Sequence, residues 1–388
     1  MIKAANNLLR SFLILSFALA MLPTLTFAQH YTQTDLVSNI PGRATVTDPN
    51  LQNAWGLVAS PTSPWWVSNN AGGTSTLYDA TGLTLSPPSV PPVAIVPING
   101  NGIVTIPGAP SQNGAAGSPT GVMFNGNAAD FHLLNGNPAR FIFVTEDGTV
   151  QGWAGGPSAT IVADNSVNPN AANGAVYKGA TIVEMDGKQF ILAANFRSGH
   201  VDVFDSAFNQ VHHSSREDDA FNDEELPDGF APFNIQGVGP NVYITYAKQD
   251  TPKHDPVGGE GLGFVDVFSS KGRLLQRLEH GSWFNAPWGV VLTTADFGEF
   301  SHTILVGNFR GGTIAALNPI TGRFIGNVLN PDGSPVNIDG LWALVFGNES
   351  AAGPAHTLFF TAGPDNEKNG LFGTLTPIGS ELGENDEQ

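Results

Sequence analysis

The sequence contains no cysteine and is poor in charged residues. Without cysteine there can be no disulfide, thiolate nucleophile, zinc–thiolate centre or iron–sulfur cluster. Asp, Glu, Lys and Arg make up 13% of the chain, about half the usual share, whereas 41% of residues are hydrophobic. A chain of this composition can bury a large core, so disorder is excluded for most of its length. Its stability must come from that core alone.

Basic residues are the scarcer charged group. The 388 residues include 16 Lys and Arg against 34 Asp and Glu, which gives a formal net charge of −18. Such a protein lacks the positive field that binds phosphate backbones, so nucleic acid is not expected as a partner. Long helices are not expected either, because 46 Gly and 28 Pro would interrupt them. The composition predicts an all-β, turn-rich protein.

Only one long apolar run occurs, at residues 11–22. Two basic residues precede it, and the small residues Thr26 and Ala28 follow it at positions suited to cleavage. This order is typical of a secretory signal peptide, so we expect residues 1–28 to be removed. An uncleaved anchor is the alternative, although the run is shorter than the roughly 20 residues that a membrane span needs. The mature chain is expected to be secreted or periplasmic, without membrane association.

What the sequence does contain is a repeat marked by its turns. Each unit has a small or aromatic pair and a short apolar strand, then a second strand ending near Asn or Gly, then a third strand of alternating polarity. Equivalent first-strand positions are 65, 60, 53, 55 and 53 residues apart, namely Leu57, Val122, Ile182, Ile235, Val290 and Ala343. Short strands with Gly-rich turns in six units predict a six-bladed β-propeller over residues 29–378. A solenoid or a pair of β-sandwiches is the alternative.

Two segments lie outside the six units. A ring of blades must hide the edge at which it closes, and residues 31–37 have the pattern of a strand. We predict that they complete the last blade from the N-terminal end, giving a closed, monomeric ring. The acidic residues 379–388 are predicted to form a disordered tail.

Seven short motifs, most of them aromatic, follow one another along the second half of the chain. They are Ala231-Pro232-Phe233-Asn234-Ile235-Gln236, Tyr246-Ala247-Lys248-Gln249-Asp250, Gly263-Phe264-Val265-Asp266-Val267-Phe268, Asn285-Ala286-Pro287-Trp288-Gly289, Leu305-Val306-Gly307-Asn308-Phe309, Ile338-Asp339-Gly340-Leu341-Trp342-Ala343-Leu344 and Phe360-Thr361-Ala362-Gly363-Pro364. Together they resemble a family of exported bacterial proteins of unknown function, some of which carry a PEP-CTERM sorting tail that this chain lacks. The resemblance covers nearly the whole mature chain. It implies a six-bladed propeller loosely similar to NHL and gluconolactonase-like rings, and no reaction.

Ligands of propellers usually bind at a mouth of the central channel, where strand ends and turns meet. Side chains that end the second strands should converge there: Asn70 (or Asn69), Glu146, Asn195, Tyr246, Asn308 and Thr361. Side chains that open the first strands should form a neighbouring ring: Trp55, Thr120, Lys178, Asn234, Trp288 and Trp342. The prediction is a polar, aromatic-rimmed pocket for a small polar ligand, a glycan or a protein. The alternative is local, because Asn tolerates positive φ in turns and Trp packs between blades.

A calcium site is the sharpest form of this hypothesis. Hard cations prefer carboxylate and carbonyl oxygens. Glu146, Asn195, Asn234 and Asn308 could supply them, as the resemblance to gluconolactonase-like rings also implies, so calcium is the candidate cofactor. The sequence has no linear calcium-binding loop of the EF-hand type.

Familiar enzyme motifs are absent from the sequence. It has no Gly-x-Ser-x-Gly elbow, His-Glu-x-x-His pair, Walker loop or complete Gly-x-Gly-x-x-Gly. His254 and Asp255 lie in an insertion of unit four, where they could form a metal or acid/base pair, although loop histidines are more often only solvated. Arg197 and Arg310 follow equivalent Asn residues, and they either bind a carboxylate together or cover blade edges.

Three functions follow from these observations. The favoured one is an exported binding protein without enzymatic activity. The second is a metal-dependent, lactonase-like hydrolase that uses calcium in the channel and Glu146 as acid or base. The third is a scaffold protein of the cell envelope or the extracellular matrix.

Overall fold

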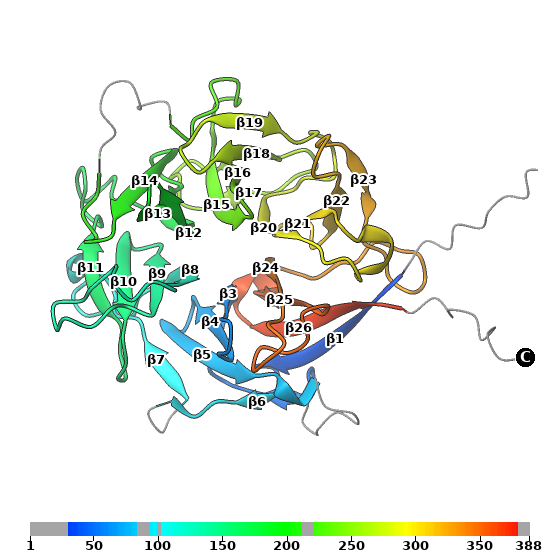
Figure 1. Cartoon of the computed structure of the whole chain (residues 1–388), viewed down its shortest axis with the longest axis horizontal. Helices are drawn as coiled ribbons and strands as arrows, with labels where there is room; N and C mark the ends of the chain where they lie inside the picture. Colours follow the sequence, from blue (N-terminus) through cyan, green and yellow to red (C-terminus); the bar gives the residue numbers. More distant parts are fainter. Residues whose placement is uncertain (1–29, 84–92, 99–101, 212–219, 379–388) are drawn as a thin grey trace, which may run out of the picture.

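The computed structural model describes residues 30–83, 93–98, 102–211 and 220–378 as six antiparallel sheets arranged around a central axis (Figure 1). Each innermost strand contacts the innermost strand of the next blade, and the last contacts the first. The prediction of an all-β, six-bladed propeller is confirmed. The predicted signal peptide (1–28) and acidic tail (379–388) lie outside the described residues. No helix within those described ranges is long and apolar enough to cross a membrane.

In blades one to five the strands follow the sequence from the axis outward, except for two that pair beside this path. Blade one contains β3 (Ala54–Val58), β4 (Trp65–Asn69), β5 (Thr74–Asp79), β6 (Ala94–Ile95) and β7 (Ile103–Thr105). Blade two contains β8 (Pro119–Phe124), β9 (Phe141–Thr145), β10 (Thr149–Trp153) and β11 (Thr160–Asp164), and blade three contains β12 (Tyr177–Met185), β13 (Lys188–Asn195) and β14 (His200–Asp205).

Blade four contains β15 (Phe230–Val238), β16 (Asn241–Gln249), β17 (Pro256–Val257), β18 (Gly263–Ser269) and β19 (Leu274–Arg277). Blade five contains β20 (Pro287–Leu292), β21 (Ile304–Asn308), β22 (Ile314–Leu317) and β23 (Phe324–Asn327), and blade six contains β24 (Leu341–Phe346), β25 (Leu358–Ala362), β26 (Leu371–Pro377), β1 (Tyr31–Ser38) and β2 (Val46–Thr47). The two exceptions are β7, which pairs with β5, and β17, which pairs with β16. In blade six the N-terminal strands β1 and β2 lie outside β26. The short helices are η1 (Thr81–Leu83), η3 (Pro110–Gln112), η4 (Gly298–Phe300) and α1 (Pro364–Glu367).

The ring closes through the N-terminal strand, as the sequence predicts. β1 pairs antiparallel with β26, from Tyr31 opposite Pro377 to Ser38 opposite Leu371. The Tyr31 hydroxyl also donates a 2.8 Å hydrogen bond to the carbonyl oxygen of Phe297 in blade five. The first strand of the chain and its last strand therefore complete one blade (Figure 1).

Backbones approach closely around the axis, and this explains the glycine after each of two axial tryptophans. A Cβ atom on Gly56 would lie 2.3 Å from the carbonyl oxygen of Thr120 in the next blade, and one on Gly289 would lie 2.5 Å from that of Trp342. Real Cβ atoms do not come this close, so only glycine fits at either position. The Trp-Gly pairs that mark units one and five are thus required by the packing of neighbouring inner strands.

Replacing Leu36 by Ala should weaken closure of the ring. Leu36 is buried in β1 within the central hydrophobic cluster, and Leu→Ala changes in cores cost about 2–5 kcal/mol. We expect the free energy of unfolding, measured by urea denaturation, to fall by that amount. Thr32 is exposed on the same strand, so Thr32→Ala should change it by less than about 0.5 kcal/mol. Equal effects of both substitutions would contradict the closure by β1.

Candidate functional site

One mouth of the channel gathers a network of charged side chains around Lys178. Lys178 lies at the start of the inner strand β12, and Glu146 directly follows β9 in the neighbouring blade. The Lys178 ammonium forms ion pairs with Glu146 and, at 3.1 Å, with Asp255 Oδ1. Its Nζ also lies 5.4 Å from the centre of the Trp55 ring. Residues from four of the six blades therefore meet at one buried charge.

Lys178 is held in the charged state by its acidic partners. Its side chain is 1% exposed, and such burial by itself would lower the pKa of the ammonium. The carboxylates of Glu146 and Asp255 outweigh burial and raise the pKa of Lys178 above its usual value. A buried charge is tolerated only when it is paired and hydrogen-bonded. Lys178 can therefore be buried at this position only because Glu146 and Asp255 pair with it.

The network continues sideways through two amides to a third acid. Asn70 Nδ2 donates a 2.7 Å hydrogen bond to Glu146 Oε2. Asn53 Nδ2 donates to Asn70 Oδ1 at 3.2 Å and to Glu367 Oε2 at 3.1 Å. The indole Nε1 of Trp342 donates to Asn53 Oδ1 at 3.0 Å. Three carboxylates thus face one mouth, and the amides between them fix their orientation.

Glu367 reaches the mouth from a turn with unusual backbone geometry. The turn α1 has left-handed dihedrals at Asp365 (φ 58°) and Asn366 (φ 56°), and Glu367 itself has φ 67°. Consecutive left-handed residues other than glycine are strained and tend to persist at functional sites. Burial, reinforced by the charge of Glu146, raises the pKa of Glu367, although Lys178 opposes this.

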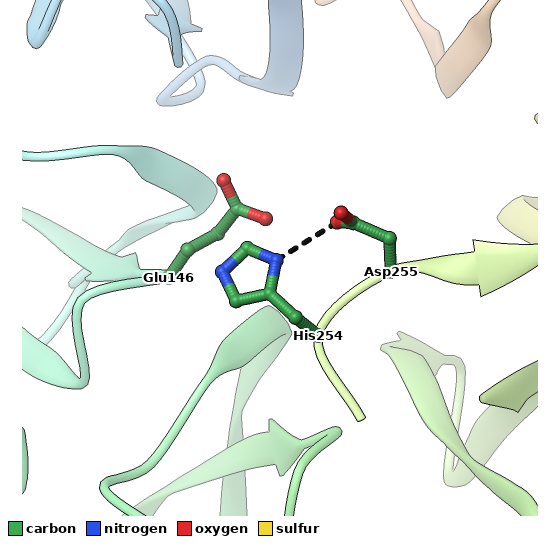
Figure 2. A group of neighbouring side chains, drawn as sticks. All are labelled: Glu146, His254 and Asp255. Carbon is green, nitrogen blue, oxygen red and sulfur yellow. Dashed lines mark hydrogen bonds and ion pairs between the residues drawn. The ribbon is translucent and has the colours of Figure 1, made fainter. Parts of the chain in front are cut away.

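His254 and Asp255 enter the mouth from the insertion between β16 and β18. Figure 2 shows the three side chains of Glu146, His254 and Asp255 pointing toward one another, and one ligand atom from each lies within 4.8 Å of the others. His254 Nδ1 lies 2.9 Å from Asp255 Oδ1. This hydrogen bond, followed by the charge of Lys178, lowers the pKa of Asp255 well below its usual value.

Sequence reasoning did not place His254 and Asp255 at the site. The sequence allowed a metal or acid/base pair there but favoured solvated loop residues, and it did not connect them with the channel mouth. One signal was present: the insertion follows the end of β16, and the ends of the second strands were already expected at the mouth. Glu367 and Asn53 were missed as well, since neither occupies an equivalent strand position.

The three tryptophans do not form the rim that the sequence suggested. They are buried and pack on one another across the axis: the rings of Trp55 and Trp342 stack at 3.6 Å, and Trp288 meets Trp342 edge-on at 5.9 Å. Past them along the inner strands, the remaining cavity has a volume of about 20 Å³, roughly enough for one water molecule. The tryptophans are a plug beneath Lys178, so a ligand that contacts the charged cluster lies above them.

Two of the predicted asparagines serve turns. Asn195 Oδ1 accepts a hydrogen bond from the Val176 backbone N at 3.3 Å, and Asn308 Oδ1 accepts one from the Asn285 backbone N at 2.9 Å. Both amide oxygens therefore satisfy neighbouring backbone groups. This is the local alternative that the sequence left open.

The four residues considered for calcium are not gathered around one point. Asn234 Nδ2 donates to the carbonyl oxygen of Trp288 at 2.8 Å, within the plug, and Asn195 and Asn308 are used in turns. Only Glu146 lies in the charged cluster, where the Lys178 ammonium already neutralises it. This set does not fit a calcium ion.

The set formed by Glu146, His254 and Asp255 has better chemistry for a metal. One imidazole and two carboxylates are ligands that zinc accepts. However, the Lys178 ammonium lies against both carboxylates, so a divalent ion between them would face a buried positive charge.

The remaining candidates make no ion pair with the charged cluster. The Tyr246 hydroxyl is buried and has no hydrogen-bond partner in the described part of the chain. Arg197 Nη1 donates to the Gly174 carbonyl oxygen at 3.0 Å, and the Arg310 guanidinium lies 4.5 Å from the centre of the Phe309 ring. Arg197 thus covers its own blade. Arg310 also packs against Gly258 of the blade-four insertion, and its charge, like that of Lys178, opposes the rise in the pKa of Glu367. The structure gives the two arginines no shared ligand.

Comparison with known proteins identifies relatives of unknown function. No family model matches the chain. Two uncharacterised proteins of Acanthamoeba polyphaga mimivirus are each 29% identical to it, one over 350 residues (88% of this chain, 78% of the relative) and the other over 352 (88% and 84%). A structural genomics protein of unknown function from Bacteroides thetaiotaomicron has a similar structure, with a TM-score of 0.51 and 10% identity over 90% of this chain and 76% of that one.

These similarities support the propeller fold and leave the activity open. The sequence motifs suggest a bacterial, exported family, whereas the sequence relatives reported above are viral. What holds of the resemblance is the coarser statement that the chain is a six-bladed propeller of unknown function.

Replacing Lys178 by Met should leave two carboxylates without a counter-charge. Removing one partner of a buried ion pair costs about 3–5 kcal/mol, so we expect the free energy of unfolding in urea to fall by that amount. The loss should be smaller in the double variant Lys178→Met/Glu146→Gln, because the neutral amide no longer needs the ammonium. Glu184→Gln, at the exposed end of the same strand β12, should change the free energy by less than about 0.5 kcal/mol. A double variant no more stable than Lys178→Met would contradict the pairing.

Proposed function

We propose that this propeller binds a small polar ligand at the mouth above Lys178. The observation that carries the proposal is the convergence of Lys178, Glu146, Asp255 and Glu367 on one point at the axis. Buried ionisable clusters in a concave site are where binding and catalysis concentrate. These charged residues are not needed to hold the turns at the strand ends, because Asn195 and Asn308 satisfy the backbone groups of such turns in two other places.

Two energetically unfavourable features support a functional rather than a structural role for this cluster. A buried ion pair contributes little net stability compared with packed apolar groups, so Lys178 and its acids are not needed to hold the blades together. The left-handed turn at Asp365 and Asn366 adds strain, and it carries Glu367 into the cluster. Strain that places one side chain is expected where that side chain contacts a ligand.

The exposure of the groups defines the ligand class. Asp255 is 57% exposed and His254 is 37% exposed, whereas Lys178 is covered. The accessible groups are therefore mainly acceptors with negative charge. A neutral or cationic ligand with several hydrogen-bond donors fits these groups, and an anionic one does not.

Thermal shift measurements with a panel of sugars, polyols, amino acids and polyamines test the proposal. A ligand present at 100 times its dissociation constant adds about 2.7 kcal/mol to the stability of the protein it binds. We expect at least one compound to raise the Tm of the wild type and to lose this effect in Glu146→Gln. The comparison uses the shift within each variant, because the substitution itself changes the starting Tm.

The matched control is Glu184→Gln, which changes an exposed acid at the other end of β12. It should respond to the same compounds as the wild type does. If every active compound shifts Glu146→Gln as strongly as the wild type, or if no compound in the panel acts, the ligand does not bind at this mouth.

A lactonase-like hydrolase is the second candidate, and the pairing of His254 with Asp255 favours it. The hydrogen bond from Nδ1 orients the imidazole and leaves Nε2 to act as a base. In this reaction Nε2 takes a proton from water as the oxygen bonds to the lactone carbonyl carbon. The ring oxygen then leaves and receives the proton from the imidazolium. This step uses only residues of the chain.

Hydrolysis of glucono-δ-lactone, followed by pH-stat titration, tests this second candidate. General base catalysis contributes about 10²–10⁴-fold, so His254→Gln should lose at least about 100-fold of the rate. His356 is exposed elsewhere on the ring, and His356→Gln should keep the wild-type rate. Wild-type hydrolysis no faster than that in buffer would exclude lactonase activity on this substrate.

We further propose that the chain acts as a monomer outside the cytoplasm. The sequence of residues 1–28 supports export, and an intact mass starting at Gln29 would verify cleavage. A scaffold role in the envelope or matrix is the remaining reading, and it gives no reason for a buried ammonium at the axis.

A further inference from the structure

A second cavity lies at the rim of the ring, between the insertion of blade four and the outer part of blade five. Its volume is about 360 Å³, within the roughly 300–1,000 Å³ of small-molecule sites. Glu260 of the insertion lines it on one side, and Phe324 and Asn327 of the outer strand β23 line it on another. We call it the rim groove. It shares no lining residue with the charged cluster at the axis.

The polar side chains of the rim groove have unused hydrogen-bonding capacity. Asn327 Oδ1 is buried and has no partner among the residues the structure describes. Asn285 Oδ1 accepts a 2.8 Å hydrogen bond from the Gly259 backbone N, and no hydrogen bond between described residues uses its Nδ2. A buried amide oxygen without a partner is unfavourable and calls for an explanation. Because Oδ1 is covered, the atom of Asn327 left to meet a molecule in the groove is Nδ2, which no hydrogen bond between described residues uses.

Two aromatic rings form a rigid apolar wall beside these polar groups. Trp283 and Phe324 stack with ring centres 4.2 Å apart and planes inclined by 5°. Gly281 packs against the indole, since a Cβ there would lie 2.3 Å from its Cη2 and Cζ3 atoms. The Trp283 Nε1 donates to the Glu279 carbonyl oxygen. The rings are therefore fixed in place, and they offer C–H edges rather than hydrogen-bonding groups.

The charge of the lining narrows the ligand class. Glu260 is the charged residue among those lining the groove, so an anion would meet no counter-charge. Asn285 and Asn327 each present an unused amide donor, and Ser282 and Thr313 add hydroxyls. We propose that the rim groove binds a neutral sugar ring, whose hydroxyls meet the amides and Glu260 and whose C–H groups pack against the edges of Trp283 and Phe324.

A cationic peptide side chain fits the rim groove less well. An ammonium could pair with Glu260, but cation–π attraction needs an open aromatic face. Phe324 covers one face of the Trp283 indole, and Gly281 packs against the ring as well. An ammonium has no acceptor, so it would also leave the amide donors of Asn285 and Asn327 unused.

Ligand-observed NMR on the full chain tests the sugar site. The probes are D-glucose, D-galactose, N-acetyl-D-glucosamine, cellobiose and Nα-acetyl-lysine amide. At least one sugar should bind with a millimolar dissociation constant, and Asn327→Leu, of similar size but without hydrogen-bonding groups, should weaken it at least about tenfold, which equals about 1.4 kcal/mol. Glu260→Gln changes the charge of an exposed lining residue without altering its shape. It should also weaken sugar binding, so it tests the same groove even if Asn327→Leu folds poorly.

A control variant separates the rim groove from the rest of the surface. Asn222→Leu alters an exposed asparagine elsewhere and should leave sugar binding unchanged. Tighter binding of cellobiose than of glucose would identify the end of a glycan as the ligand, and equal binding would identify a free sugar. The proposal is overturned if no sugar binds, if sugars bind both groove variants as they bind the wild type, or if only Nα-acetyl-lysine amide binds.

Discussion

Close packing of the six inner strands is the constraint on which the rest of the structure depends. Backbones of neighbouring blades approach until only glycine fits, as at Gly56 and Gly289. The space left along the axis is filled by the rings of Trp55 and Trp342, and past them there is room for about one water. The packed rings leave no room for a ligand at their own level of the axis. The charged cluster lies at the mouth above them.

At that mouth, the site around the buried Lys178 ammonium forms only when neighbouring blades and the last blade are brought together by the closed ring. Its partners Glu146 and Asp255 come from the blades on either side, and Asn53 connects the cluster to Glu367 in the last blade. Both ion-pair partners of Lys178 come from blades other than its own, and each residue alone would leave a charged group unsatisfied. Closure by β1 therefore positions the last blade and, through it, Glu367.

The sequence was most informative where one physical requirement acts in every blade. Every blade needs the same turns between its strands, so turn residues recur at a regular spacing and the six units could be predicted. The ring must also cover the edge at which it closes, so the closing strand could be predicted. The same equivalence placed Glu146 and Lys178 at the mouth. It could not separate Asn70, which contacts Glu146, from Asn195 and Asn308, which hold turns, because both uses put asparagine at a strand end. The tryptophans were ambiguous in the same way, since a rim and a plug need the same residue.

The position of His254 and Asp255 at the mouth could not be predicted, because their insertion occurs in one blade only. The same insertion connects the two candidate sites. Asp255 Oδ1 is anchored to Lys178 at the axis, and four residues later the Gly259 backbone N is anchored to Asn285 in the rim groove. One insertion therefore supplies groups to both candidate sites. The Asp255 carboxylate contributes to the mouth, and the Gly259 backbone N–H holds the Asn285 amide that lines the rim groove.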